Sequence, residues 1–303
     1  MRAMRIFNCG SLNIDHVYAV DHAVRQGETI AGGSYAFFAG GKGANQSVAI
    51  ARAGGEVVHV GIAGPEGRWM VDAMREDGVD VAHVAIADRP GGHAVIQVDP
   101  AGQNAIVVYG GTNRDLQPRH VDAALASARS GDALLVQNET SAVEHAICAA
   151  ANRGLTVCFN PAPMDARVAG YPLDRVSLFV VNETEGEALC GCTEPEEIVD
   201  AMLKLYPGSC VILTRGAGGV LYGDAGARET MEGIRVAARD TTAAGDTFIG
   251  YFMAGMQAGA ATHEALSLAN RAGALSVTRA GAQASIPWRR EVDSWDDRLK
   301  SQT

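Results

Sequence analysis

Short apolar runs that end at turn residues alternate with helix-like segments along most of this 303-residue chain. Such alternation is typical of βαβ units, in which a helix carries the chain back so that successive strands run parallel. We therefore predict an α/β fold with a mostly parallel, doubly wound central sheet flanked by helices on both faces. The predicted strands are Arg5–Cys9, Val57–Ile62, Ala133–Gln137, Thr156–Asn160, Leu178–Asn182 and Cys210–Thr214, and the predicted helices include Ala44–Ala53, Trp69–Asp77, Val143–Arg153 and Pro195–Tyr206.

Two segments, at about 13–40 and 92–113, interrupt this alternation. Their central parts, Val17–Ala39 and Gly92–Gly111, have the pattern of strands joined by tight turns, and neither contains a helix of its own. We expect them to form one small discontinuous β-sheet lid on a single domain that spans 1–303. Such a sheet would expose an apolar face that a second subunit could cover.

The overall charge and the cysteine spacing exclude several classes of protein. The chain has 35 acidic residues against 25 Lys and Arg, a formal net charge of −10, which argues against nucleic acid or an anionic membrane as partner. The six cysteines lack a zinc-site spacing and are expected to be reduced. No stretch has the length of a membrane span, and the first residues lack a signal-length apolar run. We expect a cytoplasmic protein.

The segment Asp240-Thr241-Thr242-Ala243-Ala244-Gly245-Asp246 leads directly into the apolar helical run 247–255. A helix N-terminus offers unpaired N–H groups and a partial positive charge, both of which attract phosphate. A carboxylate beside that phosphate is unfavourable unless it has a task, and we infer that Asp246 takes a proton from a hydroxyl that attacks phosphorus. The segment indicates a kinase of small hydroxylic molecules.

A second glycine cluster, Gly40-Gly41-Lys42-Gly43-Ala44-Asn45-Gln46, opens the helix that runs to Ala53. It does not match a P-loop, because Gly43 stands where Ser or Thr is needed, nor a dinucleotide fingerprint, because Gln46 stands where a third glycine is needed. Two interpretations remain. The loop either brings Lys42 and Asn45 to a hydroxylic ligand or is an ordinary glycine turn with a helix cap.

Polar side chains also follow several predicted strands. Asn13 and Asp15 lie one strand period apart after the first strand, and Glu139 follows the strand Ala133–Gln137. Ligands of parallel sheets bind at these strand ends, although a simple Asx turn would explain the first pair equally well. His16 and His93 are the two histidines that could face a ligand.

Two further strand ends leave similar alternatives open. Asn182 and Glu185 could hold a hydrated Mg²⁺ beside nucleotide phosphates, or they could form a helix cap. The turn Thr214–Gly219 could let nucleotide phosphates approach the backbone, or it could be a simple hairpin turn.

Taken together, these segments resemble the ribokinase (phosphofructokinase-B) family of sugar and nucleoside kinases over nearly the whole chain. The matching segments are 10–16, 27–29, 40–46, 160–163, 182–185, 240–246 and 277–288. The resemblance implies a parallel sheet with a β lid through which members commonly form homodimers. It also implies an ATP-dependent sugar kinase that uses Mg²⁺ and is activated by K⁺, with ribose 5-phosphate as the expected product.

The resemblance also implies roles for particular residues. Asp246 looks like the catalytic base in the turn Ala243, Ala244 and Gly245. The sugar would be held by Asn13, Asp15, Gly41, Lys42, Asn45, Glu139 and Asp246. ATP would contact Asn182, Thr214, Gly216, Gly219, Ala244, Gly245 and Asn270, with Glu185 acting on Mg²⁺ indirectly. The K⁺ ion is expected near Asp240, Thr242, Ser276, Arg279, Gly281 and Ser285.

The chain departs from the family pattern in a few places. Gln26 replaces a proline that usually precedes Gly-Glu-Thr, and Ala243 replaces a common glycine. His93 brings a polar ring into the lid, and it would argue against strict ribose preference if it pointed inward. The alternatives are a kinase of deoxyribose, a ketohexose, an acidic sugar or a nucleoside. A non-catalytic sugar sensor and a nicotinamide-dependent oxidoreductase are the alternatives from other classes.

Overall fold

The computed structural model describes residues 4–300 and contains a nine-stranded sheet at its centre. Seven neighbouring strands run parallel, and two strands at one edge are antiparallel. The expected α/β fold with a mostly parallel central sheet is thus confirmed. In spatial order the strands are β13 (Arg228–Met231), β12 (Val220–Gly223), β11 (Cys210–Thr214), β10 (Leu178–Asn182), β9 (Thr156–Asn160), β8 (Ala133–Gln137), β1 (Ile6–Cys9), β4 (Val57–Ala63) and β5 (Asp80–Ile86).

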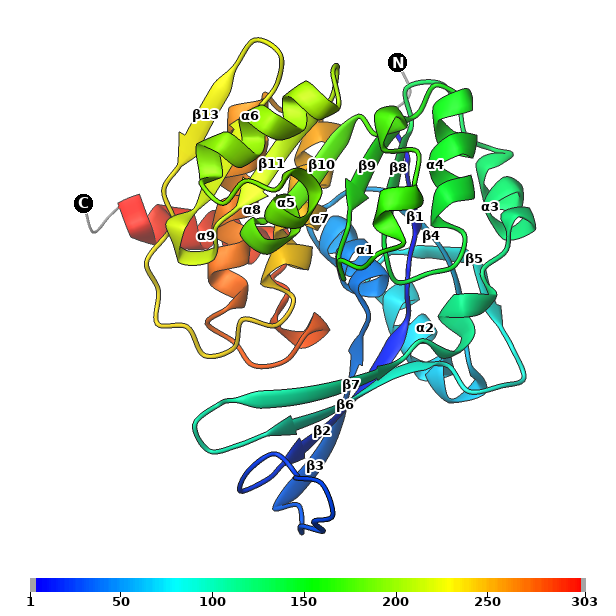
Figure 1. Cartoon of the computed structure of the whole chain (residues 1–303), viewed down its shortest axis with the longest axis vertical. Helices are drawn as coiled ribbons and strands as arrows, with labels where there is room; N and C mark the ends of the chain where they lie inside the picture. Colours follow the sequence, from blue (N-terminus) through cyan, green and yellow to red (C-terminus); the bar gives the residue numbers. More distant parts are fainter. Residues whose placement is uncertain (1–3, 301–303) are drawn as a thin grey trace.

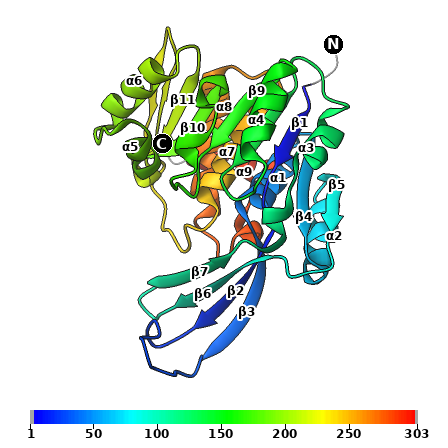
Figure 2. The ribbon, with the colours of Figure 1, turned by 45° about the vertical axis from the view of Figure 1, so that its right-hand side comes forward.

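Helices cover both faces of this sheet (Figures 1 and 2). Successive side chains of a strand point to opposite faces, so Ile6 joins one buried cluster and its neighbour Phe7 joins the other. This is why the central strands are apolar at most positions rather than at alternate ones. The first cluster packs under α1 (Lys42–Arg52), α2 (Arg68–Glu76), α7 (Ala244–Gln257), α8 (Thr262–Ser276) and α9 (Arg289–Lys300), and the second under α3 (Pro118–Leu125), α4 (Val143–Asn152), α5 (Glu183–Cys190) and α6 (Pro195–Leu205).

A separate four-stranded sheet extends from one end of the body, as both ribbon views show (Figures 1 and 2). Its strands come from the two segments that lack helices, in the order β3 (Ser34–Gly40), β2 (Asn13–Ala19), β6 (Gly92–Val98) and β7 (Asn104–Tyr109). The two hairpins are antiparallel and meet through a parallel pairing of β2 with β6. We call this sheet the lid.

The two faces of the lid differ in character. Asn13 and Asp15 point to one face, because alternate residues of a strand share a side. His93 is paired with Ile14 and therefore points to the opposite face, where its ring contacts Tyr109 at a centroid distance of 5.1 Å. His16 lies on that opposite face as well, 5.9 Å from His93 between ring centroids. Neither histidine shares a lid face with Asn13 and Asp15.

Along the described part of the chain, residues 4–300, no helix is both long enough and apolar enough to cross a membrane.

Candidate functional site

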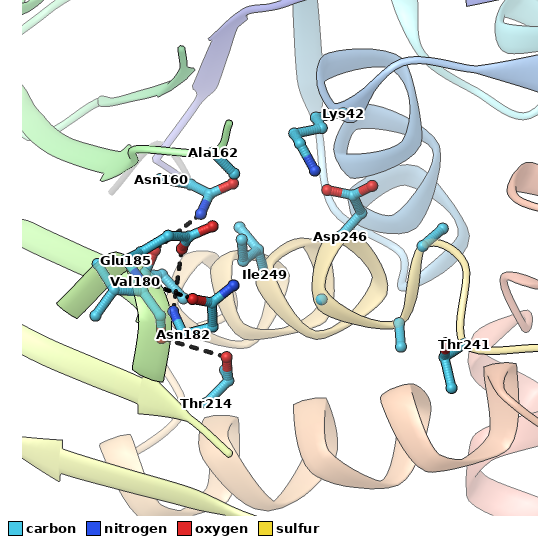
Figure 3. A pocket seen from close by; sticks show the side chains of 14 residues that line it. Lys42, Asn160, Ala162, Val180, Asn182, Glu185, Thr214, Thr241, Asp246 and Ile249 are labelled. Atoms are coloured by element: carbon cyan, nitrogen blue, oxygen red, sulfur yellow. Dashed lines mark hydrogen bonds between the residues drawn. The ribbon is translucent and has the colours of Figure 1, made fainter. Parts of the chain in front are cut away.

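The candidate site lies at the carboxyl ends of the parallel strands, where ligands bind in open α/β sheets. A cavity of about 210 Å³ opens there. Lys42 and Asp246 lie at one end of it, and Asn182, Glu185 and Thr214 lie at the other (Figure 3). The residues that line it come from α1, α5, α7 and the ends of β9, β10 and β11, so the fold brings together segments that are more than 200 residues apart.

Asp246 lies in the first turn of α7 and is buried, with 8% of its surface exposed. Both of its carboxylate oxygens accept hydrogen bonds from α1. Asn45 Nδ2 donates to Oδ2 and Gln46 Nε2 donates to Oδ1, each at 2.9 Å. The amino group of Lys42 points toward the same carboxylate (Figure 3). The structure therefore places the expected base in a cavity shared with Lys42 and in direct contact with Asn45.

The turn that begins α7 has a backbone suited to an anion. Ala243 caps the helix in the left-handed region with φ 59°, and it is the one non-glycine residue with positive φ among residues 4–300. A non-glycine residue in that region costs about 1 kcal/mol or more, so the turn is held in a strained shape. The N–H groups that follow have no partner within the helix. Ala244 and Gly245 line the cavity, so an anion in it would meet this helix terminus.

The glycine cluster before α1 forms a tight turn that places Lys42 on the cavity. Gly41 has φ 90°, and a Cβ there would lie 2.8 Å from the backbone nitrogen of Asn13. This approach brings Lys42 beside the site carboxylates. Burial of the Lys42 amino group opposes its charged form, but the nearby carboxylates, led by Asp246 and Glu139, together outweigh burial and raise the pKa of Lys42.

Three polar residues, Glu139, Asn13 and Asp15, lie near Lys42 where the lid joins the body of the protein; we call this region the mouth of the lid. Glu139 accepts hydrogen bonds from the Ser11 hydroxyl and from Lys42 N, the latter at 3.0 Å. Asn13 Oδ1 accepts from Asn113 Nδ2 at 2.7 Å, which leaves the Asn13 amide hydrogens to donate elsewhere. Burial raises the pKa of Asp15 to about 7, with further contributions from Glu139 and Asp246 and a smaller opposing one from Lys42.

Asn182 and Glu185 form the helix cap that the sequence left as one of two interpretations. Asn182 Oδ1 accepts from Glu185 N at 2.8 Å, and Glu185 Oε2 accepts from Asn182 N at 3.0 Å. Burial raises the pKa of Glu185, and both side chains also line the cavity. No cluster of three His, Cys, Asp or Glu side chains within 4–300 could hold a metal ion directly. The side chains of Asn182 and Glu185 fit a Mg²⁺ ion that is held through water and phosphate oxygens.

The expected ATP residues divide into two groups. Asn182, Thr214, Ala244 and Gly245 line the cavity. Gly216 and Gly219 belong to the hairpin turn between β11 and β12, where a Cβ on Gly219 would clash with Met231 O. Asn270 lies on α8 and donates to Glu232 O at 2.9 Å. These last three residues are not part of the cavity lining.

The residues expected around K⁺ come from two segments that Asp240 joins. Asp240 accepts from Thr242 N at 2.9 Å and from Gly281 N at 2.8 Å. These bonds outweigh burial and lower the pKa of Asp240. Three more of these side chains are engaged locally, because Ser276 donates to Gly273 O, Ser285 donates to Ala282 O, and Arg279 pairs with Glu291 at 2.7 Å. With these side chains engaged, the site fits a cation held largely by backbone carbonyls.

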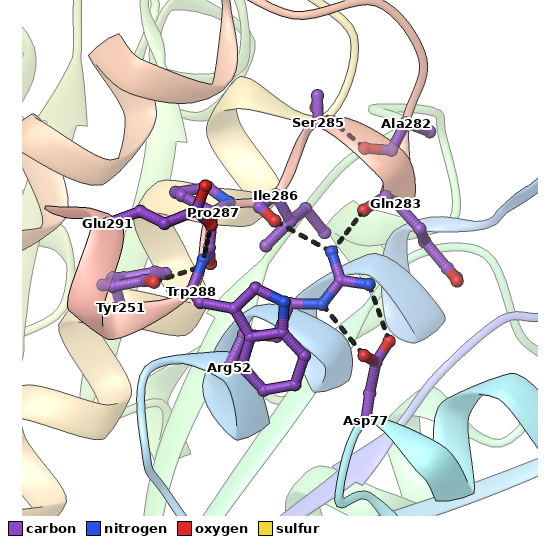
Figure 4. A network of polar contacts seen from close by, with 10 residues as sticks. All are labelled: Arg52, Asp77, Tyr251, Ala282, Gln283, Ser285, Ile286, Pro287, Trp288 and Glu291. Atoms are coloured by element: carbon purple, nitrogen blue, oxygen red, sulfur yellow. Dashed lines mark hydrogen bonds and ion pairs between the residues drawn. The ribbon is translucent and has the colours of Figure 1, made fainter.

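Arg52 was not anticipated from the sequence, and it ties this C-terminal segment to α1 (Figure 4). Its guanidinium donates to Gln283 O at 2.7 Å and to Ile286 O at 2.8 Å, and it forms a two-pronged pair with Asp77 at 3.1 and 2.9 Å. The ring of Trp288 lies against it, with the centroid 5.3 Å from Cζ. Arg52 thus links the last turn of α1 to the segment expected to hold K⁺.

Sequence reasoning also missed Ser11, Gln46 and Asn113 as site residues. Gln46 stood inside a quoted motif, but its contact with Asp246 crosses 200 positions of sequence. Asn113 follows the lid strand β7 and reaches Asn13 across 100 positions. Only the spatial arrangement of the strand ends reveals these pairs.

Comparisons with known proteins agree with this geometry. Residues 5–289 match the model of the pfkB family carbohydrate kinases. The chain is 37% identical to a ribokinase of Haemophilus influenzae over 296 residues, covering 93% of this chain and 95% of that one. It is 34% identical to a ribokinase of Bacillus subtilis over 290 residues, covering 94% and 96%.

Solved structures show the same likeness. A Cryptococcus neoformans ribokinase in complex with ADP has a TM-score of 0.84 and 34% identity, covering 97% of this chain and 99% of that chain. Arabidopsis thaliana ribokinase complexed with ribose and ATP has a TM-score of 0.86 and 29% identity, covering 97% and 98%. A Burkholderia thailandensis nucleoside kinase at 21% identity shares the fold, with a TM-score of 0.82. The family match spans nearly the whole chain and the strand-end site agrees with it, so this chain belongs to the pfkB family of carbohydrate kinases.

Proposed function

We propose that this protein transfers the γ-phosphoryl group of ATP to the primary hydroxyl of D-ribose, giving D-ribose 5-phosphate and ADP. The observation that carries the proposal is the position of Asp246, at the N-terminus of α7 and on a cavity shared with Lys42. The names of the relatives and the ribose and ATP complex of the Arabidopsis thaliana enzyme favour ribose over other sugars.

In the proposed mechanism Asp246 accepts the hydroxyl proton as the oxygen attacks phosphorus in line. The amide groups of Ala243–Asp246 and the ammonium of Lys42 stabilise the charge that spreads over the transferring phosphoryl oxygens. Asn182 and Glu185 would hold Mg²⁺ through water beside the ATP phosphates, where the ion would neutralise part of the phosphate charge. Closure of the lid over the sugar excludes water, which would otherwise accept the phosphoryl group.

The sugar is held by hydrogen bonds from the mouth of the lid in this proposal. Asp15 and Glu139 accept from ring hydroxyls, while Asn13 donates its free amide hydrogens. Asn45 Oδ1 is buried and has no hydrogen-bond partner among residues 4–300, so it is available to a hydroxyl as well. Three acceptors grouped around a single cation, Lys42, favour a neutral polyol over an acidic sugar.

We also propose that K⁺ bound near Asp240 and Gly281 activates the enzyme by fixing the turn at Ala243. When bound, the ion would supply a fixed positive charge behind that turn. Arg52 would support the site by donating hydrogen bonds to the carbonyls of Gln283 and Ile286, which fixes the segment expected to bind K⁺. A thermal unfolding scan in KCl against NaCl tests this, with a higher Tm expected in KCl.

The exposed aromatic face of the lid supports a homodimer. Tyr35, Phe37 and Tyr109 are 52%, 54% and 53% exposed there, which is unusual for large apolar side chains. Phe37→Asp should convert a dimer to monomers in sedimentation velocity. Ile106→Asp, on the opposite face by register, is the control that should leave the dimer intact. The six free cysteines agree with a reducing cytoplasmic setting.

The substrate is tested by coupled ADP release over ribose, deoxyribose, fructose and inosine, ranked by kcat/KM. The proposal expects ribose to lead by at least tenfold. A preference for fructose or inosine would show that the protein is a kinase of that substrate rather than of ribose. Binding of sugar with no ADP release under any condition would instead indicate a sugar sensor.

A further inference from the structure

The carboxylate of Asp246 is the end of a chain of buried amide side chains. Gln46 donates Nε2 to Asp246 Oδ1, and its Oε1 accepts from Gln137 Nε2 at 2.6 Å. Gln137 Nε2 also donates to Asn8 Oδ1 at 2.9 Å, and Asn8 Nδ2 donates to Gly43 O at 2.8 Å. Asn8 and Gln46 have no exposed surface and Gln137 has 1%. We call Asn8, Gln137 and Gln46 the amide relay.

The orientation of every amide in the relay follows from its two ends. Gly43 O is a backbone carbonyl and can only accept, so Asn8 must turn Nδ2 toward it and Oδ1 toward Gln137. An ionised carboxylate can likewise only accept, so Gln46 must turn Nε2 toward Asp246 and Oε1 toward Gln137. Gln137 therefore meets an acceptor on both sides and donates in both directions. Asp246 Oδ1 therefore accepts the hydrogen at the end of the relay.

This arrangement has a cost at Gln137. Its Oε1 is buried and has no hydrogen-bond partner among residues 4–300. An unsatisfied buried acceptor costs about 1–3 kcal/mol, and such atoms are uncommon in folded proteins. An apolar residue at this position would remove that cost. The amide is consistent with a requirement for two donated hydrogens rather than with core packing.

We propose that Gln46 and Gln137 are positioning residues that hold the Asp246 carboxylate turned toward the attacking hydroxyl. Gln46 acts by direct contact and Gln137 acts through Gln46. The inference rests on the proposed function, in which Asp246 is the base. A fixed rotamer matters because a shift of about 1 Å at the reacting atoms can cost roughly a hundredfold in rate.

The test compares Gln46→Met and Gln137→Met with a matched control, Gln257→Met. Gln257 also makes amide hydrogen bonds, to Met4 O at 2.6 Å and Glu56 O at 2.9 Å, but lies outside the site. Each variant is assayed by coupled ADP release for kcat and for KM of ATP. Thermal unfolding checks that each is folded.

The relay predicts that Gln46→Met lowers kcat roughly tenfold to a hundredfold and that Gln137→Met lowers it roughly threefold to tenfold. KM for ATP should stay within about twofold, because the relay contacts the base and not the nucleotide. The double variant should be no slower than Gln46→Met alone. Gln257→Met should lower Tm without changing kcat.

Normal kcat in folded Gln137→Met would overturn the relay, as would additive effects in the double variant. If Gln46→Met does not fold, the near-isosteric Gln46→Glu replaces it. A glutamate at position 46 either is ionised and cannot donate to Asp246, or is protonated and shares its proton with the Asp246 carboxylate. In both cases kcat should fall at least as far as expected for Gln46→Met, and a normal kcat would again overturn the relay. Asp246→Asn, run alongside, separates the two hypotheses. Normal turnover in Asp246→Asn would show that Asp246 is not the base. An inactive Asp246→Asn together with a normal Gln137→Met would reject only the role of the relay.

Discussion

Protonation of Asp15 should control sugar binding in the neutral range. Its pKa is raised from 3.8 to about 7, first by burial and then by Glu139 and Asp246. A carboxylate can accept two sugar hydroxyls only when it is ionised. With a pKa near 7 the ionised fraction falls about tenfold per pH unit below it, so kcat/KM for the sugar should be about a hundredfold lower at pH 5 than on its plateau above pH 8.

The assay is kcat/KM for ribose at saturating ATP from pH 5 to pH 9. Asp15→Asn should lower the plateau and abolish this limb. Glu139→Gln should move the limb to lower pH, because it removes a like charge that raises the pKa of Asp15. The same logic applied to Lys42→Met predicts a move to higher pH. A wild-type profile that is flat from pH 5 to pH 8, or a limb that persists in Asp15→Asn, would refute the reasoning.

The remaining predictions concern stability and are read from urea unfolding. Arg52→Met should lower the free energy of unfolding by about 3 kcal/mol, because it leaves the largely buried Asp77 carboxylate without its ion-pair partner and two backbone carbonyls without a donor. Arg75→Met, which breaks an exposed pair, should cost less than about 1 kcal/mol, and equal losses would contradict the assignment. Gly43→Ala should cost about 2 kcal/mol or more, since its Cβ would collide with the Gly10 backbone. Gly170→Ala, in open space, should change stability by less than about 0.5 kcal/mol.

Most of the central sheet was predictable because its strands are buried on both faces and contain few polar residues. The strands β8 to β11 match their predicted bounds, since apolar runs ended by polar turn residues leave little freedom. The antiparallel edge strands β12 and β13 were not predicted. Arg228–Met231 alternates between exposed and half-buried positions, and its pairing with β12 depends on the short turn between them, where Asp224 accepts from Gly226 N and Ala227 N.

The candidate site was predictable where a residue type has few other uses. A lone carboxylate in the first turn of a glycine-led helix, at Asp246, is such a case. The relay and the Arg52 link were not predictable, because an isolated Gln or Arg in an apolar run carries no pattern. Their meaning lies in partners such as Gln137 and Gln283, which lie 91 and 231 positions away in sequence.

The most direct test of the account is the turnover of Asp246→Asn. Asparagine keeps the shape of the side chain and removes the proton acceptor, so the fold and ATP affinity should be retained. The account predicts that kcat falls by roughly two to four orders of magnitude while the Kd for ATP changes by less than about threefold. Turnover close to that of the wild type, with folding and ATP binding intact, would contradict the central claim that this carboxylate is the base.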